Sequence, residues 1–161
     1  MDKRYTLARE KLLSGAHIVS DAAPLTEIVL NLLACGVEVH ALRDPTRGGL
    51  AATLNEIASQ SKSTLEIQEA QIPIQPTVAA ACEALGLDPL TVANEGKMVV
   101  VVAASDAQRA LQVIKDSRYG QAAQIIGEVK EGPAGRVQIR TVLGTARLLE
   151  MPSGELLPRI C

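Results

Sequence analysis

The chain has 161 residues, a length that suits one domain with a substantial hydrophobic core. Its formal net charge is −2 and it holds no Trp or Phe, so it offers neither the basic surface nor the aromatic platforms typical of nucleic-acid binding. No apolar run approaches the ~20 residues that span a bilayer, and the N-terminus lacks the apolar region of a signal peptide, so we expect a cytoplasmic protein without membrane contact.

Residues 1–19 are weakly patterned and are predicted to form an N-terminal arm. From Pro24 onward, apolar residues recur at helical spacing, and Pro24 and Gly36 suit the first turn and the end of a helix. Residues 37–42 alternate between apolar and polar side chains, as in a β-strand. A glycine-containing loop follows and leads into a second predicted helix over residues 50–60.

Further along, residues 63–69 again alternate like a strand, and a third predicted helix ends at Gly86. Residues 97–104 include four consecutive valines, which predicts a buried central strand. Ser105 and Gln108 form the pattern of a capping box before a fourth helix. Three more strands are predicted between turn residues, at 122–129, 135–142 and 146–151.

Helices and strands interleave early in the chain, whereas strands cluster late. This order predicts an α+β fold in which helices pack on one face of a mixed β-sheet. We assign residues 20–150 to this single domain. Residues 151–161 contain two prolines and a glycine, so we expect a mobile, extended tail that ends in Cys161.

The first stretch that could support chemistry is RDPTRGGL (residues 43–50), at a predicted junction between a strand and a helix; its residues 44–49 are called the DPTRGG loop. It combines the carboxylate of Asp44, the hydroxyl of Thr46 and the guanidinium of Arg47 with two glycines that permit close approach to the backbone. Free amides at a helix start favour an anion, and Arg47 could bind a phosphate. Alternatively, Asp44 or Thr46 simply caps the helix. The residues alone leave both interpretations open.

The second stretch is the NEGK loop (residues 94–97), which leads into the predicted central strand. Polar residues at the end of a core strand commonly form a site. Glu95 could serve as a general base in a desolvated pocket, and Asn94 and Lys97 stand beside it in the sequence. Alternatively, the loop is an ordinary turn with a solvated ion pair.

The third stretch is the tail, which ends in one of three cysteines, Cys161. The neighbouring terminal carboxylate disfavours the thiolate, so any reaction requires activation by a pocket elsewhere. Residues 151–161 could reach roughly 36 Å when extended. Alternatively, the terminal cysteine has no role. Cys35 and Cys82 are interpreted as small core or interface residues. No metal site is predicted, and the two histidines are expected to be structural or solvated: His17 and His40.

Taken together, four segments resemble the hydrogenase expression/formation protein HypE family: "RDPTRGGLAATLNEIA", "LGLDPLTVANEGK", "IIGEV" and the terminal "LPRIC". The resemblance runs from about Ser20 to Cys161. "DPTRGGL" alone is similar to a broader superfamily that includes aminoimidazole ribonucleotide synthetase, selenophosphate synthetase and thiamine monophosphate kinase. The closing "PRIC" narrows the resemblance to HypE.

The resemblance implies a fold like the C-terminal domain of aminoimidazole ribonucleotide synthetase. It also implies an ATP-dependent carbamoyl dehydratase that makes the cyanide ligands of nickel–iron hydrogenase. In such proteins a HypF-like carbamoyltransferase loads the C-terminal thiol, here Cys161, and the thiocarboxamide is dehydrated to a thiocyanate. The nitrile then passes to a HypC–HypD-like scaffold complex. Glu95 becomes the candidate base. The residues implied to bind substrate or phosphate are Asp44, Thr46, Arg47, Gly48, Gly49, Asn94 and Lys97.

Full-length proteins of this kind carry an N-terminal domain of comparable size, which supplies most of the ATP site, acidic residues for Mg²⁺ and the main dimer contacts. We find no such segment here and expect an isolated C-terminal domain or a natural truncation. We therefore predict that the chain alone binds ATP poorly, is inactive, and exposes an apolar patch that favours self-association. Two alternatives are a non-catalytic acceptor or partner-binding module of hydrogenase maturation, and another synthetase acting on a small phosphorylated metabolite.

Overall fold

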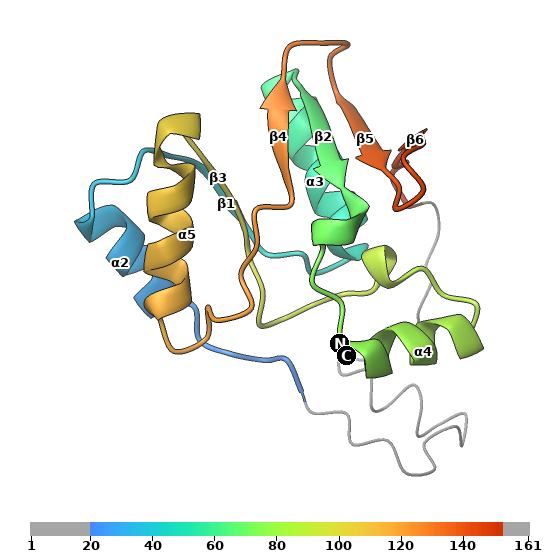
Figure 1. Ribbon diagram of the computed structural model, residues 1–161, viewed down its shortest axis with the longest axis horizontal. Coiled ribbons are helices and arrows are strands. Elements are labelled where there is room, and N and C mark those ends of the chain that lie inside the picture. Colours follow the sequence, from blue (N-terminus) through green and yellow to red (C-terminus); the bar gives the residue numbers. More distant parts are fainter. Residues whose placement is uncertain (1–19, 153–161) are drawn as a thin grey trace.

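The computed structural model describes residues 20–152 (Figure 1). The predicted N-terminal arm at 1–19 and most of the predicted tail, residues 153–161 with Cys161, lie outside the described residues. Within the described part, helices and strands interleave early and strands follow one another late, as predicted. The α+β fold class is therefore confirmed.

Each predicted helix and strand has its counterpart in the described residues, although the strand predicted at 122–129 forms only from Gly127 onward. The helices are α2 (Thr26–Ala34), α3 (Gly49–Ser61), α4 (Pro76–Ala84) and α5 (Ala107–Asp116). The strands are β1 (Val39–Arg43), β2 (Thr64–Gln68), β3 (Val99–Val102), β4 (Gly127–Lys130), β5 (Arg136–Arg140) and β6 (Ala146–Leu148). Short 3₁₀ turns are η1 (Glu69–Gln71), η2 (Pro89–Thr91) and η3 (Ala104–Asp106).

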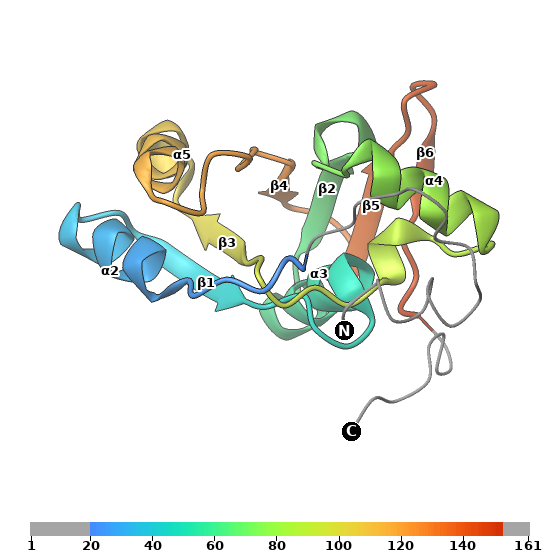
Figure 2. The same ribbon diagram turned by 90° about the horizontal axis from the view of Figure 1, so that it is seen from below.

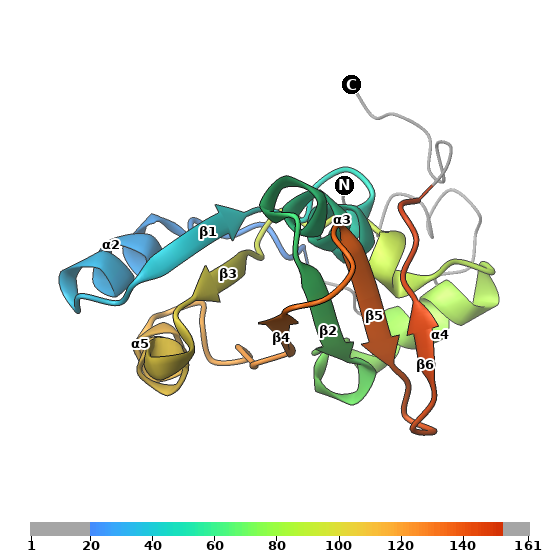
Figure 3. The same ribbon diagram turned by 90° about the horizontal axis from the view of Figure 1, so that it is seen from above.

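The larger sheet is mixed and has the strand order β4-β2-β5-β6 (Figure 3). β2 pairs parallel with β5 and antiparallel with β4, and β6 pairs antiparallel with β5. Because side chains alternate along a strand, Leu65 and Ile67 face the core while Glu66 points to the other face. There Glu66 contacts Lys130 of β4 at 3.1 Å and Arg140 of β5 at 3.4 Å.

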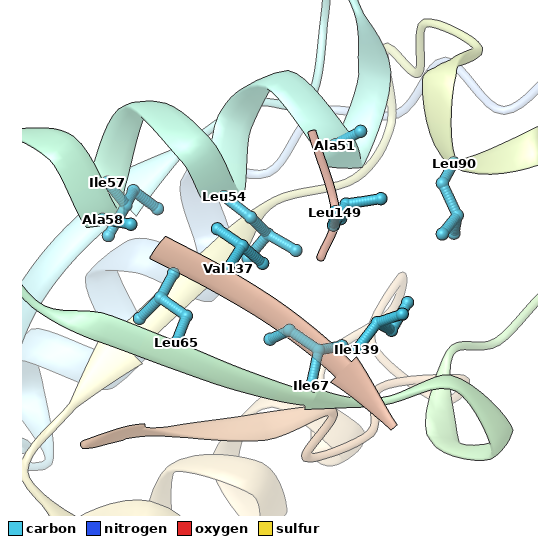
Figure 4. Close-up of a cluster of buried hydrophobic side chains, with 10 residues drawn as sticks. All are labelled: Ala51, Leu54, Ile57, Ala58, Leu65, Ile67, Leu90, Val137, Ile139 and Leu149. Carbon is cyan, nitrogen blue, oxygen red and sulfur yellow. The ribbon is translucent and has the colours of Figure 1, made fainter. Parts of the chain in front are cut away.

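Helix α3 packs on one face of this sheet and closes the main core (Figure 4). The core is built from aliphatic side chains, as expected for a chain without Trp or Phe. Burying a side chain of the size of Leu or Ile stabilises a fold by roughly 1.5–3 kcal/mol. The buried members are Ala51, Leu54, Ile57, Ala58, Leu65, Ile67, Leu90, Val137, Ile139 and Leu149.

A second, smaller group of elements combines the antiparallel pair β1–β3 with helices α2 and α5 (Figure 2). The prediction of a buried central strand for β3 is wrong, because among the described residues β3 pairs only with β1 and its valines are half-buried. The valine run has a different cause. Val100 and Val102 pack against the α2–α5 cluster, whereas Val99 and Val101 pack against the main core. The strand is apolar on both faces because it joins two cores.

The start of α5 also differs from the prediction. Ser105 and Gln108 form no capping box, because the 3₁₀ turn η3 precedes the helix and Asp106 occupies the N-cap without a side-chain cap hydrogen bond. Instead, the Asp106 carboxylate accepts hydrogen bonds from the Glu38 backbone amide and from Arg109, both at 2.8 Å. This carboxylate therefore ties the start of α5 to the segment before β1.

Several apolar side chains of the described residues are exposed. Leu30 and Leu33 on α2 are more than half exposed, and Val142 and Leu143 in the β5–β6 turn are more exposed still. Within residues 20–152, no helix has the length and apolar character needed to cross a membrane.

Candidate functional site

The DPTRGG loop joins β1 to α3, as the sequence predicts. Gly48 is the N-cap of α3 and adopts a left-handed backbone with φ of +74°, and Gly49 follows with φ of +61°. Only glycine adopts such angles readily, so both positions require it. No side chain caps α3. The alternative interpretation, in which Asp44 or Thr46 caps the helix, is therefore wrong.

Gly49 allows the close approach that was predicted, but the approaching group belongs to the chain itself. A Cβ at Gly49 would lie 2.6 Å from the carbonyl oxygens of both Leu90 and Val92. The backbone at η2 therefore packs directly on the start of α3. A phosphate does not have free access to the Gly49 backbone from this side.

A single backbone hydrogen bond joins the two predicted loops. The amide of Asn94 donates to the carbonyl oxygen of Pro45 at 2.9 Å. Pro45 is buried, and Asn94 is only 8% exposed. The Asn94 side chain donates to the carbonyl of Val92 at 2.9 Å, which holds the NEGK loop in shape. Asn94 is thus a structural residue of the junction.

Lys97 is paired within the chain. Its ammonium group contacts the Asp21 carboxylate at 3.0 Å and donates to the Asn94 side-chain oxygen at 3.1 Å. The neighbouring Gly96 lies so close to the Asp21 carbonyl that a Cβ would overlap it. The segment that leads into α2 therefore packs against the NEGK loop. The sequence analysis did not predict this contact.

The remaining predicted groups lie at the surface of this junction. Asp44, Thr46, Arg47 and Glu95 are all exposed. Arg47 makes no hydrogen bond or ion pair within residues 20–152, in contrast to Arg43, which pairs with Glu56. The structure thus brings the two loops together through their backbones and leaves the guanidinium of Arg47 available to an anion. It does not enclose Glu95 in a desolvated pocket.

The start of the tail is fixed beside the same loop. Leu149 is 5% exposed, and its amide donates to the carbonyl of Val137 at 2.9 Å. The side-chain amide of Asn55 on α3 donates to the Leu149 carbonyl at 2.9 Å. Pro152 then lies against Gly48, with its Cγ 3.7 Å from the position of a Cβ there. Pro152, the last described residue, therefore lies next to the DPTRGG loop.

Sequence reasoning missed Asp21 and Asn55. Asn55 did carry a signal, because asparagine is unfavourable inside a helix unless its side chain has a specific partner. Of the other residues considered, Cys82 is buried, which fits a core residue, whereas Cys35 is exposed, which leaves only the interface alternative for it. His40 is half-exposed beside Glu38, and His17 lies outside the described residues. No cluster of potential ligands in the described part could hold a metal ion.

The family model for the AIR synthase related protein, C-terminal domain, matches residues 1–140. The chain belongs to this family. The HypE carbamoyl dehydratase of Cupriavidus necator is 52% identical over 95% of this chain, and that of Rhizobium leguminosarum is 51% identical over 95%. The chain spans only 44% of each of these relatives. The predicted resemblance to the C-terminal domain of HypE is thereby confirmed.

Solved HypE structures share the fold. A crystal structure of the hydrogenase maturation protein HypE matches with a TM-score of 0.91 and 43% identity, over 97% of this chain and 50% of that one. A HypE structure in complex with ATP matches with a TM-score of 0.87 and 40% identity, over 93% and 47%. A structure of a HypE–HypF complex matches with a TM-score of 0.85 and 43% identity, over 91% and 48%.

Proposed function

We propose that this chain is the thiol-carrying C-terminal domain of a HypE-type carbamoyl dehydratase, which converts a carbamoylated Cys161 to a thiocyanate for the cyanide ligands of nickel–iron hydrogenase. The relatives named carbamoyl dehydratase support the reaction class. The position of Pro152 against Gly48 supports the role of the tail, because it starts the last nine residues beside the DPTRGG loop.

The reaction explains why a terminal thiol is useful. The sulfur of Cys161 attacks a carbamoyl group presented by a HypF-like carbamoyltransferase, the donor's leaving group departs, and the thiol proton is lost. This leaves a thiocarboxamide, S–C(=O)–NH₂. Dehydration then removes the oxygen and both N–H protons as the C≡N bond forms. ATP supplies a phosphoryl group that makes the amide oxygen a good leaving group, so the products are the thiocyanate, ADP and phosphate.

In this scheme Arg47 stabilises negative charge near the travelling thiocarboxamide, because its guanidinium is exposed and has no partner within residues 20–152. Asp44 and Thr46 line the same loop, with Gly48 and Gly49 shaping its backbone. Glu95 remains the candidate base. Since Glu95 is exposed, its action requires a covering surface that excludes water.

Lys97 is already paired with Asp21, and the backbone at η2 lies against Gly49, which supports a nucleotide site outside these two loops. The HypE relatives extend well beyond this chain, and one HypE structure is described as a complex with ATP. We propose that the other half of such proteins contributes the nucleotide site with its Mg²⁺, and that this domain alone is inactive.

The partners follow from the same reasoning. The crystal structure of a HypE–HypF complex supports a HypF-like donor of the carbamoyl group. A HypC–HypD-like scaffold complex would receive the nitrile. The exposed Leu30 and Leu33 on α2 offer apolar surface for self-association.

The intact mass of the protein tests this function. The chain is incubated with a HypF-like enzyme, carbamoyl phosphate and ATP, with and without a separately expressed front half of a HypE relative. We expect a carbamoyl adduct in both cases, and loss of one water from the adduct only when the front half is present. Cys161→Ala should abolish the adduct, whereas Cys35→Ala should leave it intact. No adduct on the wild-type chain would refute the proposal.

A second candidate is a stand-alone acceptor module, which the pairing of Lys97 with Asp21 and the packing of η2 on Gly49 favour. It predicts a carbamoyl adduct that persists even with the front half present.

A further inference from the structure

We propose that Asn55 is a positioning residue for the tail, which holds the point from which Cys161 travels. This inference rests on the proposed carrier role of the thiol. Asn55 lies on α3, half-buried, and its side-chain amide donates hydrogen bonds to two carbonyl oxygens, each at 2.9 Å. One belongs to Ala51 in its own helix and the other to Leu149, 94 residues further along the chain.

The two bonds use both N–H groups of the amide, so Asn55 bridges the helix to the end of β6. Among the described residues, Leu149 is the last one buried in the main core, since Glu150 and Met151 are exposed. The Asn55 bond therefore lies at the boundary between the packed domain and the segment that leaves it.

The location of this boundary matters because it limits where the thiol can go. Nine residues follow Pro152, and an extended segment of that length reaches roughly 30 Å. Pro152 lies against Gly48, so an extended segment after it would start beside the DPTRGG loop. Without the Asn55 bond, Leu149 keeps the bond from its amide to Val137, but its carbonyl is no longer held to α3. This loosens the start of the tail and lowers the effective concentration of the thiol at the loop.

The test measures intramolecular disulfide formation in the 161-residue chain between native Cys161 and a cysteine placed in the loop by Thr46→Cys, in a Cys35→Ser background. We compare Asn55→Asp, which keeps the side-chain shape but has no donor, and Asn55→Ala with Gln60→Ala, an exposed position on the same helix. We expect the disulfide rate to fall roughly threefold in both Asn55 variants, a change within the range of one lost hydrogen bond, and to stay unchanged in Gln60→Ala.

Two further readouts separate positioning from folding. The amide of Leu149 should exchange its hydrogen faster in the Asn55 variants, while the amides of β2 and β5 keep their protection. Reaction of Cys161 with a small thiol reagent should be unaffected. An unchanged disulfide rate, whether or not Leu149 exchanges faster, would overturn the positioning role. Since none of these measurements involves carbamoyl transfer, their outcome is independent of whether the proposed function holds.

Discussion

The backbone amide of Asn94 donates a 2.9 Å hydrogen bond to the carbonyl oxygen of Pro45 and so joins two loops that lie 49 residues apart in the sequence (94 − 45). Both residues are buried, and polar backbone groups that are buried need partners. The loops therefore act as one structural unit, and changes that separate them should affect both.

The contact between Gly49 and η2 gives the sharpest stability prediction. Gly49→Ala should destabilise the domain by about 3 kcal/mol or more, because the new Cβ combines a left-handed backbone with overlap of the η2 carbonyls. Gly86→Ala is the matched control, since Gly86 has φ of +64° but no atom within 4 Å of the added Cβ, and it should cost only about 1–2 kcal/mol. Urea denaturation of both variants measures the difference, and equal losses would contradict the packing described.

The ion pair between Lys97 and Asp21 predicts that each side chain contributes a small amount to the free energy of unfolding, and that the two contributions are coupled. The ammonium group is about half exposed, so Lys97→Met and Asp21→Asn should each destabilise the domain by under about 1 kcal/mol. The double variant should cost less than the sum of the two, because each single change removes the same interaction. A double-mutant cycle from denaturation curves gives the coupling. Strict additivity would show that the two side chains act independently.

Arg47 and Arg43 offer a matched pair for activity. Both are exposed, but Arg43 pairs with Glu56 whereas Arg47 has no partner within the described residues. In the chain joined to an intact front half of a HypE relative, Arg47→Ala should slow thiocyanate formation by about tenfold or more, because it removes a charge near the developing anion. Arg43→Ala should change this rate by less than about threefold. Single-turnover rates of thiocyanate formation, followed by mass spectrometry, measure both effects. Equal rates for the two variants would show that Arg47 has no such role.

Glu66 predicts a specific pH dependence of stability. The hydrogen bond from Lys130 holds the pKa of Glu66 below its ordinary value of about 4.5, with a further contribution from Arg140. A depressed pKa stabilises the fold above the pKa of the unfolded state, and this stability is lost as the pH falls through the folded-state value. The stability difference between wild type and Glu66→Gln should therefore shrink below about pH 4.5. Glu131→Gln, in the exposed turn after β4, should show no such change. Denaturation curves of wild type and both variants across pH measure the difference, and the same pH dependence in both variants would contradict the role given to Glu66.

Local patterns predicted the elements well, because aliphatic periodicity and turn residues act over short distances. They failed for β3, where four valines indicated a central strand although the strand joins two separate cores. They also failed at Ser105, and they left open the start of α3, where left-handed Gly48 stands in place of a polar cap. Sequence patterns could not identify the partners of Lys97 and Asn55, because Asp21 and Leu149 are 76 and 94 residues away along the chain. Such pairings depend on the tertiary fold.

The parallel pairing of β2 with β5 has a consequence for synthesis on the ribosome. Between the end of β2 at Gln68 and the start of β5 at Arg136 lies nearly half of the chain, so the main sheet cannot close until its late strands have been translated. Until then Val137, Ile139 and Leu149 are missing from the core and α3 is covered only in part, so a nascent chain at this stage is exposed to aggregation. Among the described residues, Leu149 is the last to enter this core, so the core is complete only once almost the whole chain has been translated.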